Sequence, residues 1–189
     1  MAPSSRRRGT TVTLSIIASP VILGKMAEMD QVAQLDSADS TPESVCLAVA
    51  KIFHVGETEV ALLELNGSLL NFIYPAELKT AGAIPLSSSA VAARTARTRL
   101  GDIFNGFTQV KHFSVFELVK LGDTGLDAQV IQKLMSAPVF AGNGDVIGVI
   151  QISRKAPRLE AAGPDFTPDD LKNLESIARE VGRLMARNA

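Results

Sequence analysis

The chain has 189 residues, of which 46% are hydrophobic and 21% are charged, and its formal net charge is −1. These values are typical of a globular protein with one domain and a well-filled core. The near-neutral charge gives no electrostatic case for nucleic-acid binding, which needs a basic face, so we expect no nucleic-acid partner. One cysteine, Cys46, and two histidines offer neither a disulfide nor a thiolate or histidine metal cluster, and a reducing, cytoplasmic location is expected.

The first 40 residues precede the expected domain. Three arginines, Arg6–Arg8, are followed by an apolar run from Leu14 to Leu23, an order that resembles the opening of a secretory signal. Pro20 interrupts the run, and no small-residue cleavage site follows at a suitable distance. The run is also shorter than the roughly 20 apolar residues of a membrane span, so we expect no membrane association. We interpret residues 1–40 as an arm and connector that packs on the domain or on a partner.

The first part of the domain predicts a helix and a hairpin. Thr41 is expected to cap a helix whose first position is Pro42. Apolar residues at helical spacing form the buried stripe of that helix: Val45, Val49, Ile52 and Phe53. Two strands, 58–65 and 68–74, follow on either side of Asn66-Gly67, the favoured pair for a two-residue hairpin turn.

The middle of the chain predicts shorter elements. Residues 84–86 are typical of a short edge strand. A helix is expected over 90–100, ended by Gly101. Residues 102–130 form a variable segment, in which the apolar spacing favours a helix over 111–121.

The last third predicts a second hairpin and a long helix. Strands over 131–140 and 145–153 flank a glycine-rich turn, and an amphipathic helix opens at Phe166–Asp170. The order of elements predicts an α+β fold. We expect an antiparallel sheet of five to six strands, with the N- and C-terminal helices on one face and the variable helix and loop segment on the other. The domain then covers residues 41–189.

Four segments in this order resemble the GAF domain family, the small-molecule-sensing relatives of PAS domains. They read ALLELNGSLLNFIYP (61–75), IPLSSSAVAARTARTRLGDIF (84–104), MSAPVFAGNGDVIGVIQISRK (135–155) and FTPDDLKNLESIA (166–178). They are similar to the family's first hairpin, its segment of small residues before a helix, its second hairpin and its closing helix. The resemblance covers about residues 41–186 and implies the same fold.

The resemblance also bears on the type of ligand. Cyclic-nucleotide-binding members carry a signature of Asn, Lys, Phe, Asp and Glu. The corresponding residues here are Arg154, Lys155, Phe166, Asp170 and Leu171, so the Asn and the Glu are replaced. The resemblance implies a structural pair of Lys155 and Asp170 that holds the last strand to the last helix, and the two replacements argue against a cyclic nucleotide.

A GAF-like pocket is expected between the sheet and the variable segment. Its candidate ligand-binding residues are Phe104, Asn105, Phe107, Lys111, His112, Phe116 and Gln151. An apolar wall with a few polar groups is what a small-molecule site needs. The alternative is that these aromatic side chains simply fill the core. A lone histidine without a second ligand does not predict a haem or a metal site, and the sequence leaves the cofactor unknown.

Thiol chemistry in similar proteins gives two further hypotheses for Cys46. Some GAF-like photoreceptors attach a bilin through a cysteine, and one GAF-like enzyme reduces free methionine sulfoxide through paired cysteines. Cys46 lies on the first expected helix and has no second cysteine to resolve it. It is therefore interpreted as a buried structural thiol, and no enzymatic activity is predicted.

Two functions remain open. The first is a sensory or regulatory module that binds a small molecule and signals through a partner protein or a dimer interface. The alternative is a ligand-free dimerisation or protein-interaction module. In either case the terminal helices are expected to form a homodimer interface through Leu174, Ala178, Val181 and Met185.

Overall fold

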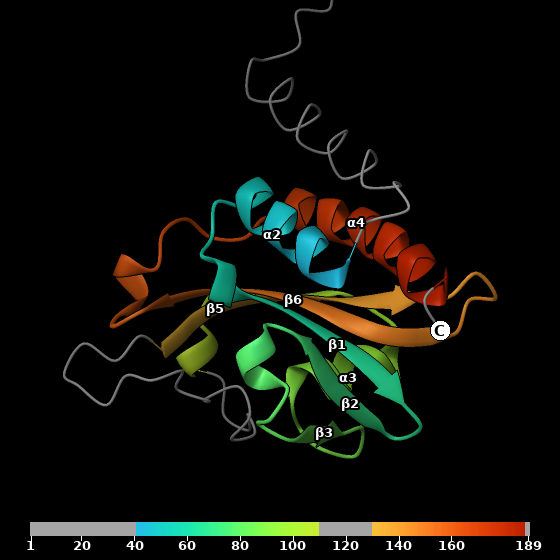
Figure 1. Ribbon diagram of the computed structural model, residues 1–189. Coiled ribbons are helices and arrows are strands. Elements are labelled where there is room, and N and C mark those ends of the chain that lie inside the picture. The colour runs from blue at the N-terminus through green and yellow to red at the C-terminus, as the bar shows by residue number, and fades with distance from the viewer. Residues whose placement is uncertain (1–40, 110–129, 188–189) are drawn as a thin grey trace, which may run out of the picture.

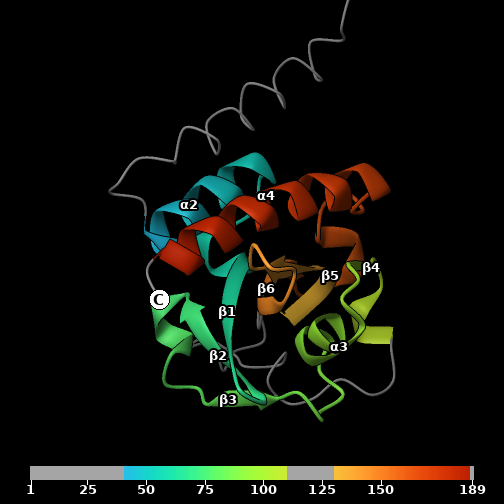
Figure 2. The same ribbon diagram turned by 90° about the vertical axis from the view of Figure 1, so that its right-hand side faces the viewer.

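A six-stranded antiparallel sheet separates two layers of helix in the computed structural model, which describes residues 41–109 and 130–187 (Figures 1 and 2). The strand order is β3-β2-β1-β6-β5-β4. The strands are β1 (Val60–Asn66), β2 (Leu69–Tyr74), β3 (Ala83–Pro85), β4 (Asp102–Phe104), β5 (Val130–Phe140) and β6 (Val146–Ala156). The helices of the described residues are α2 (Pro42–Ile52), α3 (Val91–Thr98) and α4 (Pro168–Arg187).

The arrangement of these layers confirms the predicted α+β class. Helices α2 and α4 lie side by side over one face of the sheet, and the shorter α3 lies on the opposite face (Figure 2). The expected arm, residues 1–40, and the helix expected over 111–121 lie outside the described residues. Of the helices that the structure describes, none combines the length and the apolar character of a membrane span.

Helix α2 begins where the sequence predicted. The Thr41 hydroxyl accepts a hydrogen bond from Ser44 N at 3.2 Å, and Ser44 Oγ accepts one from Thr41 N at 3.1 Å. This reciprocal cap satisfies two backbone donors that the helix cannot pair internally. The predicted stripe of Val45, Val49, Ile52 and Phe53 is buried against the sheet.

The first hairpin turn is one residue later than predicted. The pairing of Asn66 with Leu69 leaves Gly67 and Ser68 as the two connecting residues. Gly67 has φ +62°, a left-handed conformation that glycine adopts without steric cost. Asn66 instead ends β1, where its side chain donates to Glu64 Oε2 at 3.0 Å.

Helix α3 and the residues after it also differ from prediction. The helix ends at Thr98, because Arg99 takes a left-handed φ of +63° and its backbone N–H bonds to Thr95 O. Gly101 is therefore not the cap. Residues 102–104, which open the expected variable segment, form the edge strand β4, whose partner is β5. A strand this short has too little sequence periodicity to be recognised, and it lacks a marker such as the proline of β3.

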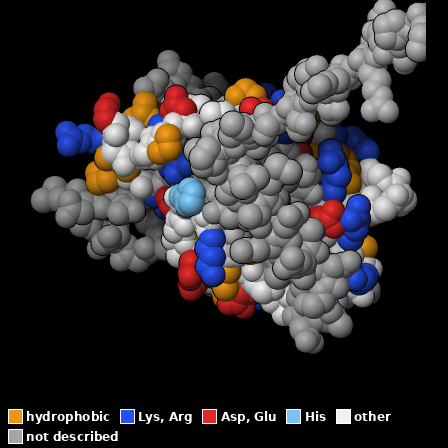
Figure 3. All heavy atoms as spheres, turned by 90° about the horizontal axis from the view of Figure 1, so that it is seen from above, with side chains coloured by type: hydrophobic (Ala, Val, Ile, Leu, Met, Phe, Trp, Pro, Cys, Tyr) orange, Lys and Arg blue, Asp and Glu red, His pale blue; other side chains and the backbone are white. Residues whose placement is uncertain are grey.

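The face beneath α2 and α4 holds the largest apolar cluster. Residues of both helices and of β1, β5 and β6 contribute to it, and many of them are fully buried. Helix α4 comes especially close to the sheet at Gly182, where an added Cβ would overlap the carbonyl oxygen of Phe140. The described side chains that are visible from this side mix both signs of charge (Figure 3).

The burial of α4 overturns the predicted dimer interface. Leu174, Ala178 and Val181 are 0, 1 and 2% exposed within a single chain, because they face the sheet. Side chains that already form the core have no surface left for a second copy. The 3-4 spacing that suggested an interface was the spacing of the core-facing stripe. Met185 alone is only partly buried, at the end of the helix.

Candidate functional site

Three polar side chains lie in a row on the face of the sheet that α3 covers. Thr95 on α3 contacts Ser136 on β5, with 2.8 Å between Oγ1 and Oγ. Gln151 on β6, directly opposite Ser136 in the strand pairing, donates from Nε2 to the same oxygen at 3.3 Å. All three are nearly buried, since their exposed fractions are 1, 0 and 7%. We refer to Thr95, Ser136 and Gln151 as the polar row.

The amide of Gln151 keeps unused hydrogen-bonding capacity. A glutamine side chain carries two N–H donors and a carbonyl oxygen with two acceptor positions. In residues 41–109 and 130–187, its only hydrogen bond is the one to Ser136. The neighbouring positions on the same face, Val149 and Leu134, are apolar and buried. A nearly buried amide with a free acceptor on an apolar wall is suited to bind a polar group of a small molecule.

Phe107, a predicted pocket residue, lies in the core instead. Its ring is 2% exposed and packs with Val91 and Leu134. The ring of Phe104 is half-buried and meets Phe107 edge-on, with 6.3 Å between centroids and an angle of 84°. The Arg94 guanidinium lies 5.9 Å from the Phe104 centroid. The alternative in which aromatic residues fill the core therefore holds for Phe107, while Phe104 lies at the edge of this cluster.

Asn105 makes a structural contact in place of the predicted ligand contact. Its Nδ2 donates to Phe166 O at 2.9 Å, and Phe166 N donates to its Oδ1 at 2.9 Å. This two-point contact fastens the end of β4 to the segment before α4. The nitrogen and the oxygen of the side-chain amide are thereby both paired with Phe166. The remaining candidates, Lys111, His112 and Phe116, lie outside the described residues.

Lys155 and Asp170, the expected strand-to-helix pair, each make hydrogen bonds with other residues. Lys155 Nζ donates to Thr58 O at 2.7 Å, while the Asp170 carboxylate accepts from Thr167 N and Oγ1 at 2.9 and 2.7 Å. Burial lowers the pKa of the Lys155 ammonium, and the nearby Glu59 carboxylate opposes that shift. A direct pairing of Lys155 with Asp170 stays a prediction.

Two other cations hold the strands to the segment before α4, a role that was not predicted. The Arg154 guanidinium lies 4.8 Å from the centroid of the Phe166 ring and donates to Phe53 O at 3.3 Å. Lys133, 5% exposed, donates from Nζ to Gly163 O at 2.7 Å and to the Asp165 carboxylate at 2.6 Å. Lys133 and Arg154 are neighbours in the strand pairing, a juxtaposition that only the register of β5 and β6 creates.

Cys46 is not placed for chemistry. It is 0% exposed within α2, and burial, with a smaller contribution from Glu43, raises the pKa of the thiol to about 12. At neutral pH the side chain is therefore a protonated thiol, whereas a nucleophile or metal ligand must be a thiolate. The described residues also contain no group of three His, Cys, Asp or Glu side chains that could hold a metal ion.

Comparisons with known proteins agree with this architecture. The model of the GAF domain family matches residues 48–185. A search of curated proteins found no match. Among solved structures, the GAF domain of A. aeolicus nlh2 in an inactive state aligns with a TM-score of 0.62 at 15% identity, covering 89% of this chain and 99% of that one.

Two further solved structures illustrate the range of proteins with this fold. The GAF domain of Acinetobacter phosphoenolpyruvate-protein phosphotransferase has a TM-score of 0.64 at 12% identity and covers 87% of this chain and 94% of that one. The free methionine-R-sulfoxide reductase of Neisseria meningitidis, in complex with its substrate, has a TM-score of 0.61 at 14% identity, with 90% and 93% covered. At these identities the likeness concerns the fold alone.

Proposed function

The chain belongs to the GAF domain family, and from that premise we propose that it is a sensory or regulatory module that binds a small molecule. The ligand lies on the α3 side of the sheet and contacts Gln151. The bound module signals through a partner protein or a second copy of the chain, in the cytoplasm. The observation that carries this proposal is the unused acceptor of a side chain that is 93% buried, since its exposed fraction is 7%.

The reason lies in the position of this oxygen. Among the described residues the one fully buried side-chain polar atom without a partner is Arg154 Nε, so Gln151 Oε1 is not completely withdrawn from solvent. A ligand that donates to Gln151 Oε1 would therefore meet an accessible acceptor beside an apolar wall. Thr95 and Ser136 would then fix the orientation of the Gln151 amide, through the hydrogen bond from Gln151 Nε2 to Ser136 Oγ.

A thiol-dependent reductase activity is not part of this proposal. The structures with this fold include free methionine-R-sulfoxide reductases. Redox chemistry at sulfur needs an accessible thiolate, whereas Cys46 is the only cysteine of the sequence and is buried with its pKa raised to about 12.

The binding proposal can be tested with native mass spectrometry and thermal unfolding of the full chain. We expect a noncovalent adduct on purified protein, or a metabolite that raises Tm in a screen. A ligand at 100 times its Kd adds about 2.7 kcal/mol, which corresponds to roughly 5–10 °C for a chain of this size. The variant Gln151→Leu should lose the adduct or the shift.

The matched control is Gln132→Leu. Gln132 is also buried, but both ends of its amide are paired. Its Nε2 donates to Ala156 O at 3.0 Å, and its Oε1 accepts from Thr108 Oγ1 at 3.3 Å. This variant should be less stable and still bind. If no compound binds, or if Gln151→Leu binds as well as the parent, the proposed site is wrong. The mass of the ligand-free chain reports separately whether it is a homodimer.

A further inference from the structure

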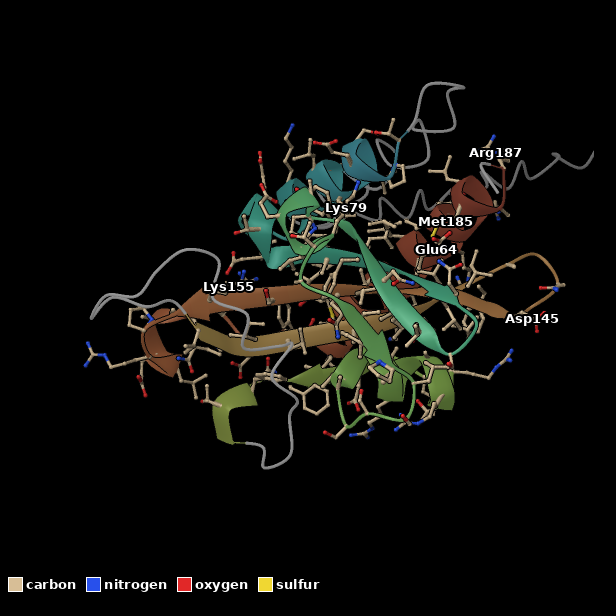
Figure 4. All side chains as sticks on the ribbon, turned by 60° about the horizontal axis from the view of Figure 1, so that its bottom comes forward. Glu64, Lys79, Asp145, Lys155, Met185 and Arg187 are labelled. Atoms are coloured by element: carbon tan, nitrogen blue, oxygen red, sulfur yellow. The ribbon has the colours of Figure 1, made fainter. Side chains whose placement is uncertain are left out.

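A groove lies on the other face of the sheet, at the end where α2 begins and α4 finishes. Its volume is about 390 Å³, within the range of about 300–1,000 Å³ that ligand sites occupy. Figure 4 shows three of its residues, Glu64 on β1, Lys79 after β2 and Met185 on α4. The full lining is Thr41, Pro42, Glu43, Glu64, Ile73, Tyr74, Ala76, Lys79 and Met185. We call it the α2–α4 groove.

The groove combines an apolar floor with charges at its rim. Ile73 and Met185 are only partly buried although they border the main core cluster. Glu43 and Glu64 supply carboxylates and Lys79 supplies one ammonium, so the lining carries a net negative charge. In the residues described, the Glu64 carboxylate bonds to the uncharged side chain of Asn66. An occupant with aliphatic side chains and neighbouring positive charge would match both features.

The chain itself carries a segment with both features, close to Thr41 in the sequence. Thr41, the first residue that the structure describes, lines the groove, so the preceding 40 residues connect to the domain at its rim. They include the apolar run Leu14–Leu23, which has Arg6–Arg8 before it and Lys25 after it. We infer that the run Leu14–Leu23 of the same chain docks in the α2–α4 groove.

The covalent connection favours this occupant over a separate molecule. Residues 24–40 separate the run from Thr41, and an extended chain spans about 3.3 Å per residue, so the connector is long enough to fold back. The cost of closing such a loop grows only with the logarithm of its length. A tethered segment has an effective concentration of about millimolar, which a free partner rarely reaches. The docked run covers Ile73 and Met185 and withholds them from other chains.

The test uses methionine-methyl NMR on the full chain. Met185 lines the groove, while Met135 is 0% exposed and reports on the integrity of the core. A nitroxide is attached at Ser15→Cys, and Cys46 does not compete for it because its thiol is buried and its pKa is about 12. The Met185 methyl signal should lose most of its intensity, and reduction of the nitroxide should restore it.

Two sets of variants, made in the Ser15→Cys chain, separate docking from simple proximity. Ile16→Glu combined with Ile17→Glu places charges in the apolar run and should restore the Met185 signal. Gln31→Glu combined with Gln34→Glu adds the same charges to the connector, away from the run and from Arg6–Arg8, and should leave the signal broadened.

On the groove side, Glu64→Lys should weaken the broadening, whereas Glu160→Lys, an exposed position outside the groove lining, should not. An unchanged Met135 signal verifies that each variant is folded.

Three results would overturn the inference. The Met185 signal could keep its intensity in the labelled chain. It could stay broadened after the two glutamates enter the run. It could also broaden only when a labelled chain without the isotope is mixed with an isotope-labelled chain without the nitroxide, which would assign the occupant to a second copy.

Discussion

Helices α2 and α4 on one face of the sheet, and α3 on the other, are packed by different means. Under the 20-residue α4 the contacts are apolar and closely fitted, from Leu174 and Val181 to the backbone contact at Gly182. Under the 8-residue α3, smaller apolar clusters alternate with the hydrogen-bonded polar row. The comparison indicates that one face supplies most of the stability, while the other keeps polar groups that a ligand can use, at some cost in stability.

The largest expected effect is on the closely packed face. Val181→Glu buries a carboxylate without a partner in the core and should lower the free energy of unfolding by several kcal/mol, enough to prevent folding. Chemical denaturation monitored by circular dichroism measures the loss. Ala186→Glu, at an exposed position of the same helix, should stay close to the parent. A folded Val181→Glu protein would contradict the packing, and if the parent were a dimer and this folded variant a monomer, the interface that the burial of α4 excludes would be revived.

A smaller loss is expected where α4 touches β5. In Gly182→Ala the new methyl group meets Phe140 O, so the helix must shift, at a cost of about 1–3 kcal/mol. Gly142→Ala is the matched control, because its added Cβ would have no neighbour within 4 Å. Urea denaturation of both proteins should show a lower midpoint for Gly182→Ala alone. Equal midpoints would mean that α4 does not sit this close to the strand.

The contact between Asn105 and Phe166 joins the end of β4 to the segment before α4. Its loss should lower the stability by a similar or smaller amount. Asn105→Ala leaves the backbone N–H and C=O of Phe166 without their partner, and each such group costs about 1–3 kcal/mol if water does not replace the lost bond. Thermal unfolding measures the change. Asn173→Ala, on α4, removes an amide that makes no hydrogen bond among the described residues, and it should leave Tm nearly unchanged. If Asn105→Ala keeps the parental Tm but abolishes ligand binding, Asn105 serves the site directly.

The smallest effect on stability is expected in the polar row. Gln151→Leu loses one hydrogen bond but places an apolar side chain at a nearly buried position, and the two effects oppose each other. The free energy of unfolding should therefore change by less than about 1 kcal/mol. Urea denaturation tests this value in the same preparation that is used for binding. A large destabilisation would indicate that Gln151 serves the core, and the contrast between the two faces would then disappear.

Local signals in the sequence were sufficient for much of the fold. The cap at Thr41, the stripe from Val45 to Phe53 and the two hairpins depend on residues near one another in the chain, so they could be predicted. The turn at Gly67 was misplaced by one residue, because Asn66-Gly67 and Gly67-Ser68 are both compatible with the flanking strands and the pairing of Asn66 with Leu69 decides between them.

The candidate site was less predictable from the sequence. Phe107 and Asn105 had the composition of a pocket wall, but Phe107 packs on Leu134 and the Asn105 amide pairs with Phe166, which is 61 residues away in the chain. Gln151 was predicted without its partners, because Thr95 and Ser136 reach it only through the placement of α3 and the register of β5 and β6.

The sequence by itself determined the order of elements, the α+β class and the resemblance to GAF domains, because hydrophobic periodicity and turn residues act over short distances. Tertiary structure decided which apolar stripe faces inward, and so removed Leu174, Ala178 and Val181 from any interface. It also decided which amide side chains have both ends paired in hydrogen bonds, as at Asn105, and which keep an unpaired acceptor, as at Gln151. The physical reason is that burial and hydrogen-bond pairing are properties of neighbours in space, which strand register and helix placement bring together.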